Sequence, residues 1–126
     1  MLCAPTTAQM AGIEALRNGD GYVREMVEEY NRRRKIMVEG LRKIGFSCFE
    51  PKGAFYTFPR IENFGLSSDD FARRLLIEEK VVVVPGNVFG DVGEGYIRCS
   101  YATSRKNIKE ALSRIENFVE RLRDGK

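Results

Sequence analysis

The stretch VVVVPGNVFGDVGEGYIRCSYA, residues 81–102, decides how the rest of the chain is expected to fold. Four valines in succession predict a short strand buried on both faces. Pro85 and Gly86 are expected to end this strand, because proline cannot donate a backbone hydrogen bond and glycine adopts angles that other residues avoid. A glycine-rich loop follows, and residues 96–101 predict a second strand.

The alternation of residues 96–101 divides their side chains between two faces of the expected strand. The more apolar set should cover a core and consists of Ile97, Cys99 and Tyr101, whereas Tyr96, Arg98 and Ser100 lie on the other face. Arg98 is therefore expected to point away from the core, beside a flexible loop. Its planar guanidinium matches a carboxylate or a phosphate. The alternative is an arginine on a solvated sheet face with a local Asp or Glu partner.

Helical patterns surround this stretch. Thr6 or Thr7 is expected to cap a first helix that is apolar around most of its circumference, and residues 20–44 have helical spacing up to Gly45. Ser67 predicts a capped helix that buries Phe71, Leu75 and Leu76 and ends near Lys80. Residues 104–122 show the most regular helical period in the chain.

Two short segments complete the expected sheet. Residues 46–49 and 54–58 are rich in β-formers and are separated by Pro51 and Gly53, which predicts a hairpin. Residues 54–58 and 81–84 should lie parallel, with the Arg98 strand between them and antiparallel to both. The predicted fold class is α+β: a small mixed, mostly antiparallel sheet of three or four strands, covered by helices and helical at both ends.

Composition excludes several classes of function. The 126 residues suit one domain, and a net charge of +3 is too small to indicate nucleic acid or membrane partners. The chain has no His, which removes His-based metal sites and Ser–His or Cys–His nucleophile pairs. Three widely spaced cysteines favour a reducing compartment, so we expect a cytoplasmic protein.

The order of three motifs resembles the carboxyl-terminal part of class I/II aminotransferases, pyridoxal-phosphate enzymes with the aspartate aminotransferase fold (fold type I). The motifs are GAFYTFP at 53–59, VVVVPGNVFG at 81–90 and GYIRCSYA at 95–102, and the segment CAPTTAQ at 3–9 fits the same family. The resemblance implies that Arg98 binds the α-carboxylate of an amino acid or 2-oxo acid substrate. It also makes Phe89 and Phe55 candidates for the pocket wall or for the segment that closes over substrate.

The resemblance also implies what this stretch of sequence does not contain. The family binds pyridoxal 5′-phosphate through a large domain that carries the aldimine-forming lysine, and none of the seven lysines here stands in that motif. We therefore expect residues 1–18 to link a missing large domain to a small domain at residues 19–126, with a homodimer as the complete enzyme. The chain alone is expected to be inactive.

Two other interpretations stay open at this point. The chain could be an autonomous α+β module that binds an amino acid without catalysis. It could also be an oligomerisation segment that uses the apolar helix around residues 8–16.

Overall fold

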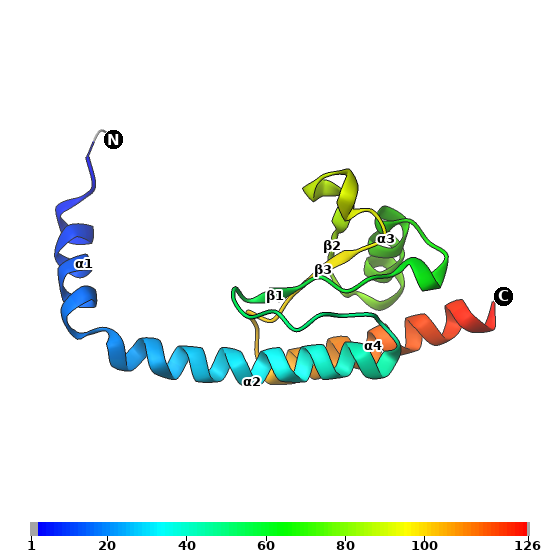
Figure 1. Cartoon of the computed structure of the whole chain (residues 1–126), viewed down its shortest axis with the longest axis horizontal. Helices are drawn as coiled ribbons and strands as arrows, with labels where there is room; N and C mark the ends of the chain where they lie inside the picture. The colour runs from blue at the N-terminus through cyan, green and yellow to red at the C-terminus, as the bar shows by residue number, and fades with distance from the viewer. Residues whose placement is uncertain (1–2, 126) are drawn as a thin grey trace. The chain divides into compact units, whose positions relative to one another are not determined.

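The computed structural model describes residues 3–125, and Met1, Leu2 and Lys126 lie outside the described residues. The chain divides into two compact units, Met1–Asn31 and Arg32–Lys126. The helices are α1 (Thr6–Asn18), α2 (Asp20–Ile44), α3 (Ser68–Glu79) and α4 (Arg105–Asp124). The strands are β1 (Tyr56–Thr57), β2 (Val84–Pro85) and β3 (Ile97–Ser100), and the short 3-10 turns are η1 (Glu62–Phe64), η2 (Gly86–Phe89) and η3 (Asp91–Gly93). The predicted α+β class is confirmed, with helices at both ends (Figure 1).

The first unit contains α1 and the beginning of α2. The predicted threonine cap is wrong, because α1 starts directly after Pro5 without a side-chain cap hydrogen bond, and Thr6 and Thr7 already lie in its first turn. None of its residues is buried in the described chain. Met10, Ile13 and Leu16 are 63%, 44% and 89% exposed. The division of the chain at residue 18 stays a prediction.

The second unit is built on a three-stranded sheet in the order β1-β3-β2. β3 pairs antiparallel with both neighbours, so the prediction that the Arg98 strand lies between the other two is confirmed. The strand expected at residues 81–84 is wrong in its bounds: Val82 is 75% exposed, and the pairing runs through Pro85, opposite Ile97. Proline is tolerated there because β2 is an edge strand.

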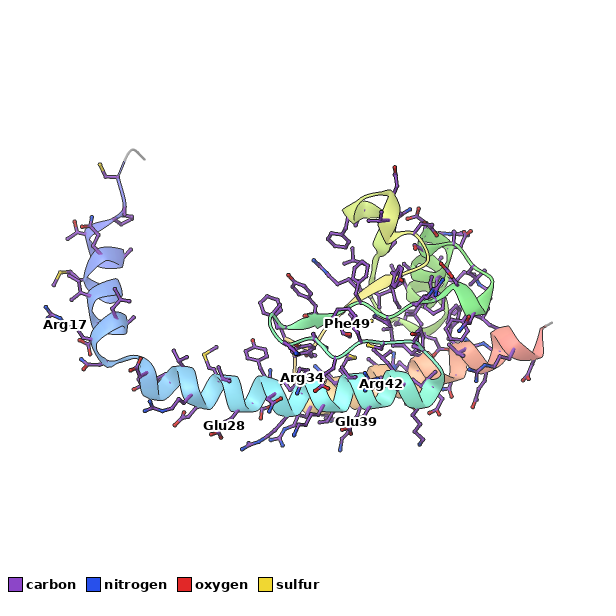
Figure 2. All side chains as sticks on the ribbon, viewed as in Figure 1. Arg17, Glu28, Arg34, Glu39, Arg42 and Phe49 are labelled. Atoms are coloured by element: carbon purple, nitrogen blue, oxygen red, sulfur yellow. The ribbon has the colours of Figure 1, made fainter. Side chains whose placement is uncertain are left out.

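The predicted hairpin between residues 46–49 and 54–58 is also wrong. Ser47 forms only an isolated bridge with Arg60, and β1 pairs with β3 instead. Side chains of α2 hold the first segment: Arg34 forms an ion pair with Glu50, and Arg42 Nε donates to the Cys48 carbonyl at 2.9 Å (Figure 2). These contacts hold Cys48 and Glu50 against α2.

The core lies between the inner face of the sheet and the helices. Ile97, Cys99 and Tyr101 are at most 4% exposed, as the alternation predicted. The α4 helix lies alongside the carboxyl-terminal half of α2, where a Cβ at Gly40 would lie 2.4 Å from a Leu112 methyl group. Four phenylalanines from different segments interlock, with ring centroids 4.8–6.1 Å apart: Phe46, Phe64, Phe71 and Phe118.

The α3 helix follows its predicted start and end. Ser67 Oγ accepts from the Asp70 amide at 3.1 Å, and Lys80 ends the helix in a left-handed conformation. Leu75 is buried, but Leu76 is 45% exposed, so its predicted burial is wrong. Because Leu76 directly follows Leu75 on the helix, it faces about 100° away from it.

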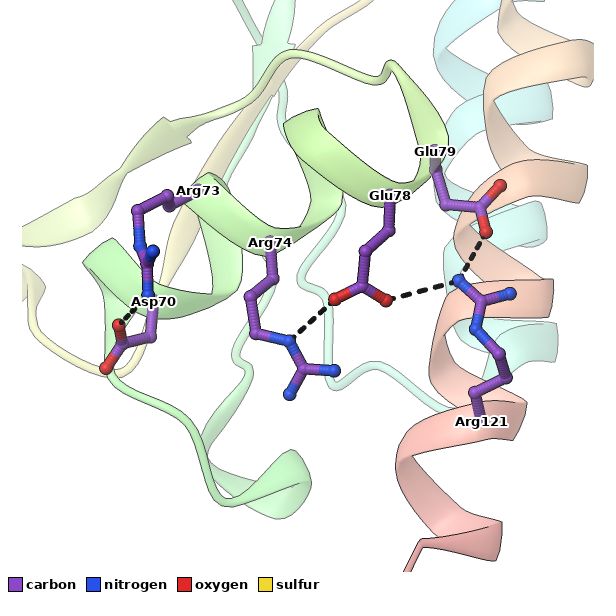
Figure 3. Close-up of polar contacts among 6 residues, drawn as sticks. All are labelled: Asp70, Arg73, Arg74, Glu78, Glu79 and Arg121. Atoms are coloured by element: carbon purple, nitrogen blue, oxygen red, sulfur yellow. Dashed lines mark hydrogen bonds and ion pairs between the residues drawn. The ribbon is translucent and has the colours of Figure 1, made fainter.

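Ion pairs connect α3 to α4 at the surface (Figure 3). Arg121 Nη2 lies 3.4 Å from Glu78 Oε2 and 2.5 Å from Glu79 Oε1, and Glu78 also accepts from Arg74 Nε at 2.8 Å. These side chains are partly exposed, and pairs of this kind contribute little stability. They link the two helices at the surface, while the phenylalanines supply the buried apolar area.

Candidate functional site

Arg98 lies on the central strand of the sheet and on the face opposite the core. It stands directly across from Val84 on β2, and its neighbours Ile97 and Cys99 point inward. Its side chain is half-buried. A central strand with partners on both sides is a rigid mount for a single cation, because its backbone hydrogen bonds leave little freedom for the Cα position.

Two aromatic rings contact the Arg98 guanidinium. Arg98 Cζ lies 5.1 Å from the ring centroid of Tyr56 and 4.9 Å from that of Phe89. The Phe89 ring contacts Phe58 at 5.7 Å, and Phe58 stacks on Tyr96 at 5.6 Å. We call these four side chains the aromatic cluster: Tyr56, Phe58, Phe89 and Tyr96. Distances of this size are typical of cation–π contacts, which favour a cation over the electron-rich ring face.

Close backbone contact holds the loop that carries Phe89. A Cβ at Gly86 would lie 2.0 Å from the Gly93 carbonyl oxygen, so glycine alone fits there. The Gly86 amide donates to the Tyr96 carbonyl at 2.8 Å, and Asn87 Nδ2 donates to Asp69 Oδ2 at 2.6 Å. The loop is thus fastened to both β3 and the start of α3.

A second tie fastens the far end of the loop. Glu94 Oε1 accepts from the Ser68 amide at 2.8 Å, and the Gly95 amide donates to Ser68 Oγ at 2.9 Å. The hydrogen bond from the Ser68 amide, at the start of α3, holds the pKa of Glu94 below its usual 4.5. Ser68 itself is fully buried, so its hydroxyl needs this partner.

The thiols and Tyr101 serve the framework. Burial raises the pKa of Cys99 to about 12 and also raises the pKa of Cys48, so neither thiol is a thiolate near neutral pH. The Tyr101 hydroxyl donates to the Ala54 carbonyl at 3.1 Å and holds a turn in which Ala54 has a φ of 61°. Tyr101 therefore serves the core, as the alternation predicted, and its hydroxyl also anchors the turn before β1.

The resemblance to aminotransferases implies a cofactor that carries an aldehyde, pyridoxal 5′-phosphate. Its anchor is a lysine that forms an imine with the cofactor aldehyde. The lysines among residues 3–125 are all exposed on helices or turns: Lys35, Lys43, Lys52, Lys80, Lys106 and Lys109. Lys80 Nζ moreover donates to the Ile77 carbonyl at 2.8 Å.

Residues 3–125 contain no group of three or more His, Cys, Asp or Glu side chains placed to hold a metal ion. No helix in that range is both long enough and apolar enough to cross a bilayer.

Of the three site residues named from the sequence, the structure brings two together. Phe89 lies against Arg98, whereas Phe55 contacts the Tyr56 ring at 5.4 Å and thus stands at the edge of the cluster. Tyr56, which also lies against Arg98, is not among these three residues. The signal that finds it is alternation: Tyr56 and Phe58 stand two residues apart in one extended segment, as Tyr96 and Arg98 do in another, so each pair is expected to share a face.

Comparison with known proteins gives one consistent result. The family model for aminotransferase class I and II matches residues 1–115. The aspartate aminotransferase of Pyrococcus horikoshii is 52% identical over 115 residues, which are 89% of this chain and 29% of that protein. The aromatic-amino-acid aminotransferase 2 of Thermococcus litoralis is 46% identical over 119 residues, 93% of this chain and 31% of that protein.

Solved structures agree with the sequence matches. A crystal structure named Pyrococcus protein-A1 superposes with a TM-score of 0.91 at 44% identity, covering 94% of this chain and 31% of that one. The aspartate aminotransferase of Thermotoga maritima gives a TM-score of 0.83 at 40% identity, covering 94% and 29%. The chain therefore spans about a third of the length of the relatives that it matches.

Proposed function

Since the chain belongs to the class I and II aminotransferase family, we propose that it forms the small domain of a complete aminotransferase and that Arg98 binds the substrate's α-carboxylate. The substrates would be an amino acid and a 2-oxo acid, which share that group. The transfer of the amino group would then belong to the complete enzyme.

The observation that carries this proposal is the state of Arg98. Its guanidinium is half-buried on a rigid strand and contacts two rings. Among residues 3–125 it forms no ion pair or hydrogen bond with the protein, so the local Asp or Glu partner of the alternative interpretation is not found there. A guanidinium whose donors are unused can donate two parallel hydrogen bonds to a carboxylate.

This geometry would orient the substrate. Two parallel N–H···O bonds fix the carboxylate plane, and the rings beside it exclude water from one side. Each charge-assisted bond contributes about 1.5–3 kcal/mol before the cost of desolvating the two ions. Holding the carboxylate in one plane also limits how the rest of the substrate can lie, which lowers the entropy that the reaction must still lose.

The cofactor-binding part of the enzyme would lie in a large domain outside this chain. The family uses pyridoxal 5′-phosphate, and its anchoring lysine would lie in the rest of the enzyme, since none of the seven lysines here stands in the family's lysine motif. The partners of the chain would be that large domain and, in a homodimer, a second copy. The 126-residue chain alone would then be inactive.

The test is a change at Arg98 in an aminotransferase that carries this chain as its carboxyl-terminal third, for example joined to the first two thirds of the Pyrococcus horikoshii relative. We expect Arg98→Ala to lower kcat/KM for an α-amino acid by about 30- to 1,000-fold, a loss of roughly 2–4 kcal/mol. Arg98→Lys should recover little of this, because the ammonium keeps the charge but not the planar pair of donors.

The informative measurement is the ratio of kcat/KM for an α-amino acid to kcat/KM for the amine that lacks its carboxylate. This ratio should fall in Arg98→Ala, because only the amino acid uses the contact. An Arg98→Ala enzyme with an unchanged ratio would remove Arg98 from the substrate site.

A further inference from the structure

Arg98 differs from several other arginines of the second unit in what its guanidinium contacts. Arg42, Arg114 and Arg123 donate to backbone carbonyls, at 2.9, 3.0 and 2.8 Å. Arg74 and Arg121 donate to glutamates of α3. Arg74 and Arg123 also lie over aromatic rings, at 5.5 and 5.8 Å, so a ring contact does not by itself prevent hydrogen bonding. Within residues 3–125, Arg98 is held by rings alone, at shorter distances.

This difference has a chemical consequence. A guanidinium offers its flat faces to aromatic rings and its five N–H groups, all in its plane, to acceptors. An aspartate or a carbonyl would hold the group by occupying those N–H groups, and a ligand would have to displace it. A ring contact supplies no oxygen or nitrogen acceptor, so the N–H groups stay available for one.

The two rings come from different parts of the fold. Tyr56 belongs to β1, which pairs with β3, while Phe89 ends the η2 turn, which the Gly86–Gly93 contact fastens. Phe89 also rests on Phe58, and Phe58 on Tyr96, so the ring has support of its own. Each ring is partly exposed, at 40% for Tyr56 and 50% for Phe89, although burial would stabilise an aromatic side chain more.

We propose that Tyr56 and Phe89 are positioning residues for Arg98, which hold its guanidinium by ring contact so that a pair of its donors stays available to a carboxylate ligand. This proposal rests on the proposed role of Arg98 and adds which side chains hold its guanidinium in position. The rings themselves need not touch the carboxylate. The ligand class is an α-carboxylate of an amino or 2-oxo acid.

The first test uses the 126-residue chain and needs no activity. In nitrogen-15 NMR spectra, the Nε–H signal of Arg98, assigned by its loss in Arg98→Lys, should be shifted by the ring currents. Phe89→Leu and Tyr56→Leu, which keep apolar bulk but remove a ring, should each move this signal toward the position of a free arginine and speed rotation about the Cζ–N bonds. Tyr56→Phe should leave it in place.

The matched control is Phe49→Leu, since Phe49 is an exposed phenylalanine at 65% and forms no ring contact with Arg98. It should not move the Arg98 signal. An Arg98 signal that is unaffected by both ring variants, in chains whose other signals show the native fold, would overturn the proposal.

The second test uses the same hybrid enzyme as the Arg98 experiment. Phe89→Leu and Tyr56→Leu should each lower the amino-acid-to-amine ratio of kcat/KM by about three- to thirty-fold, the range of a cation–π contact. The loss should appear mainly in KM, and Tyr56→Phe should restore the ratio. In an Arg98→Ala background the ring variants should lower the ratio no further, because the group that they position is gone.

The two hypotheses fail in distinguishable ways. A ratio unchanged by Arg98→Ala would refute carboxylate binding by Arg98 itself. A ratio that collapses in Arg98→Ala but is insensitive to both ring variants would leave the arginine in the site and refute its positioning by the rings.

Discussion

Single residues decide whether the loop beside Arg98 can form. Gly86 is buried, and the atom that any other residue would add there meets the Gly93 carbonyl oxygen at 2.0 Å. The Gly86 amide is also committed to the Tyr96 carbonyl. The loop cannot relieve such a clash without losing that hydrogen bond, and Phe89 lies only three residues further on.

We predict that Gly86→Ala lowers the free energy of unfolding by about 1–3 kcal/mol, as overpacking in a tight site does. Urea unfolding monitored by circular dichroism measures this change. The same variant should weaken the ring contact with Arg98, which the NMR experiment above detects.

Gly53→Ala is the matched control, because a Cβ at Gly53 would meet nothing within 4 Å. Its unfolding free energy should stay within about 0.5 kcal/mol of the parent chain, as for an ordinary surface change. Equal losses at the two glycines would show that the Gly86–Gly93 contact does not constrain the loop.

At the scale of elements, the tie between Glu94 and the start of α3 predicts a pH dependence. The Ser68 amide stabilises the charged carboxyl, so the pKa of Glu94 in the folded chain is lower than its usual 4.5. A carboxyl with a lowered pKa stabilises the fold above its unfolded pKa, and this contribution is lost as the pH falls through the lowered value.

The measurement compares the chain with Glu94→Gln, which cannot ionise. The parent chain should be more stable by a constant amount above about pH 5.5, and the difference should shrink as the pH falls below about 4.5. The comparison cancels the other carboxyls, including Asp70, whose pKa Ser67 also lowers. A difference that stays flat down to about pH 3 would show that the Glu94–Ser68 bond does not stabilise the fold.

Elements whose signals are local could be predicted from the sequence. The Ser67 cap, the stop at Gly45 and the in–out alternation of β3 each depend on a few adjacent residues, and each is confirmed. In place of the predicted 46–58 hairpin, β1 pairs with β3, and Arg42 on α2 donates to the Cys48 carbonyl. The sequence pattern contains no sign of that contact.

The same distinction applies to the candidate site. Alternation alone predicted that Arg98 would leave the core, and β3 bears this out. Tyr56 lies beside Arg98 because β1 pairs with β3, and this strand order cannot be seen in the sequence. The position of Phe89 depends in turn on the close contact between Gly86 and Gly93. Distant backbone contacts of this kind leave no periodic pattern in a sequence.

At the scale of the whole molecule, the second unit has a core of its own, while the first exposes its apolar side chains. Tyr22, Val23, Met26 and Val27, at the start of α2, are each at least 57% exposed, and α1 contains no buried residue. Apolar surface of this extent is unfavourable in water and usually marks a site of contact with another surface. In the proposed enzyme that surface would be the large domain or a second copy of the chain.

We predict that the 126-residue chain self-associates through α1. Burying a Leu or Met side chain contributes about 1.5–3 kcal/mol, so Leu16→Gln and Met10→Gln should each lower the association constant by roughly tenfold or more. Sedimentation velocity over a range of concentrations measures it. The melting temperature should hardly change, because both side chains are already exposed in the single chain.

Arg17→Gln is the matched control, since it places the same residue next to Leu16 on the same helix and removes no apolar surface (Figure 2). A parent chain that stays monomeric at every concentration, or an equal effect of Arg17→Gln, would show that the apolar side chains of α1 do not form a contact surface.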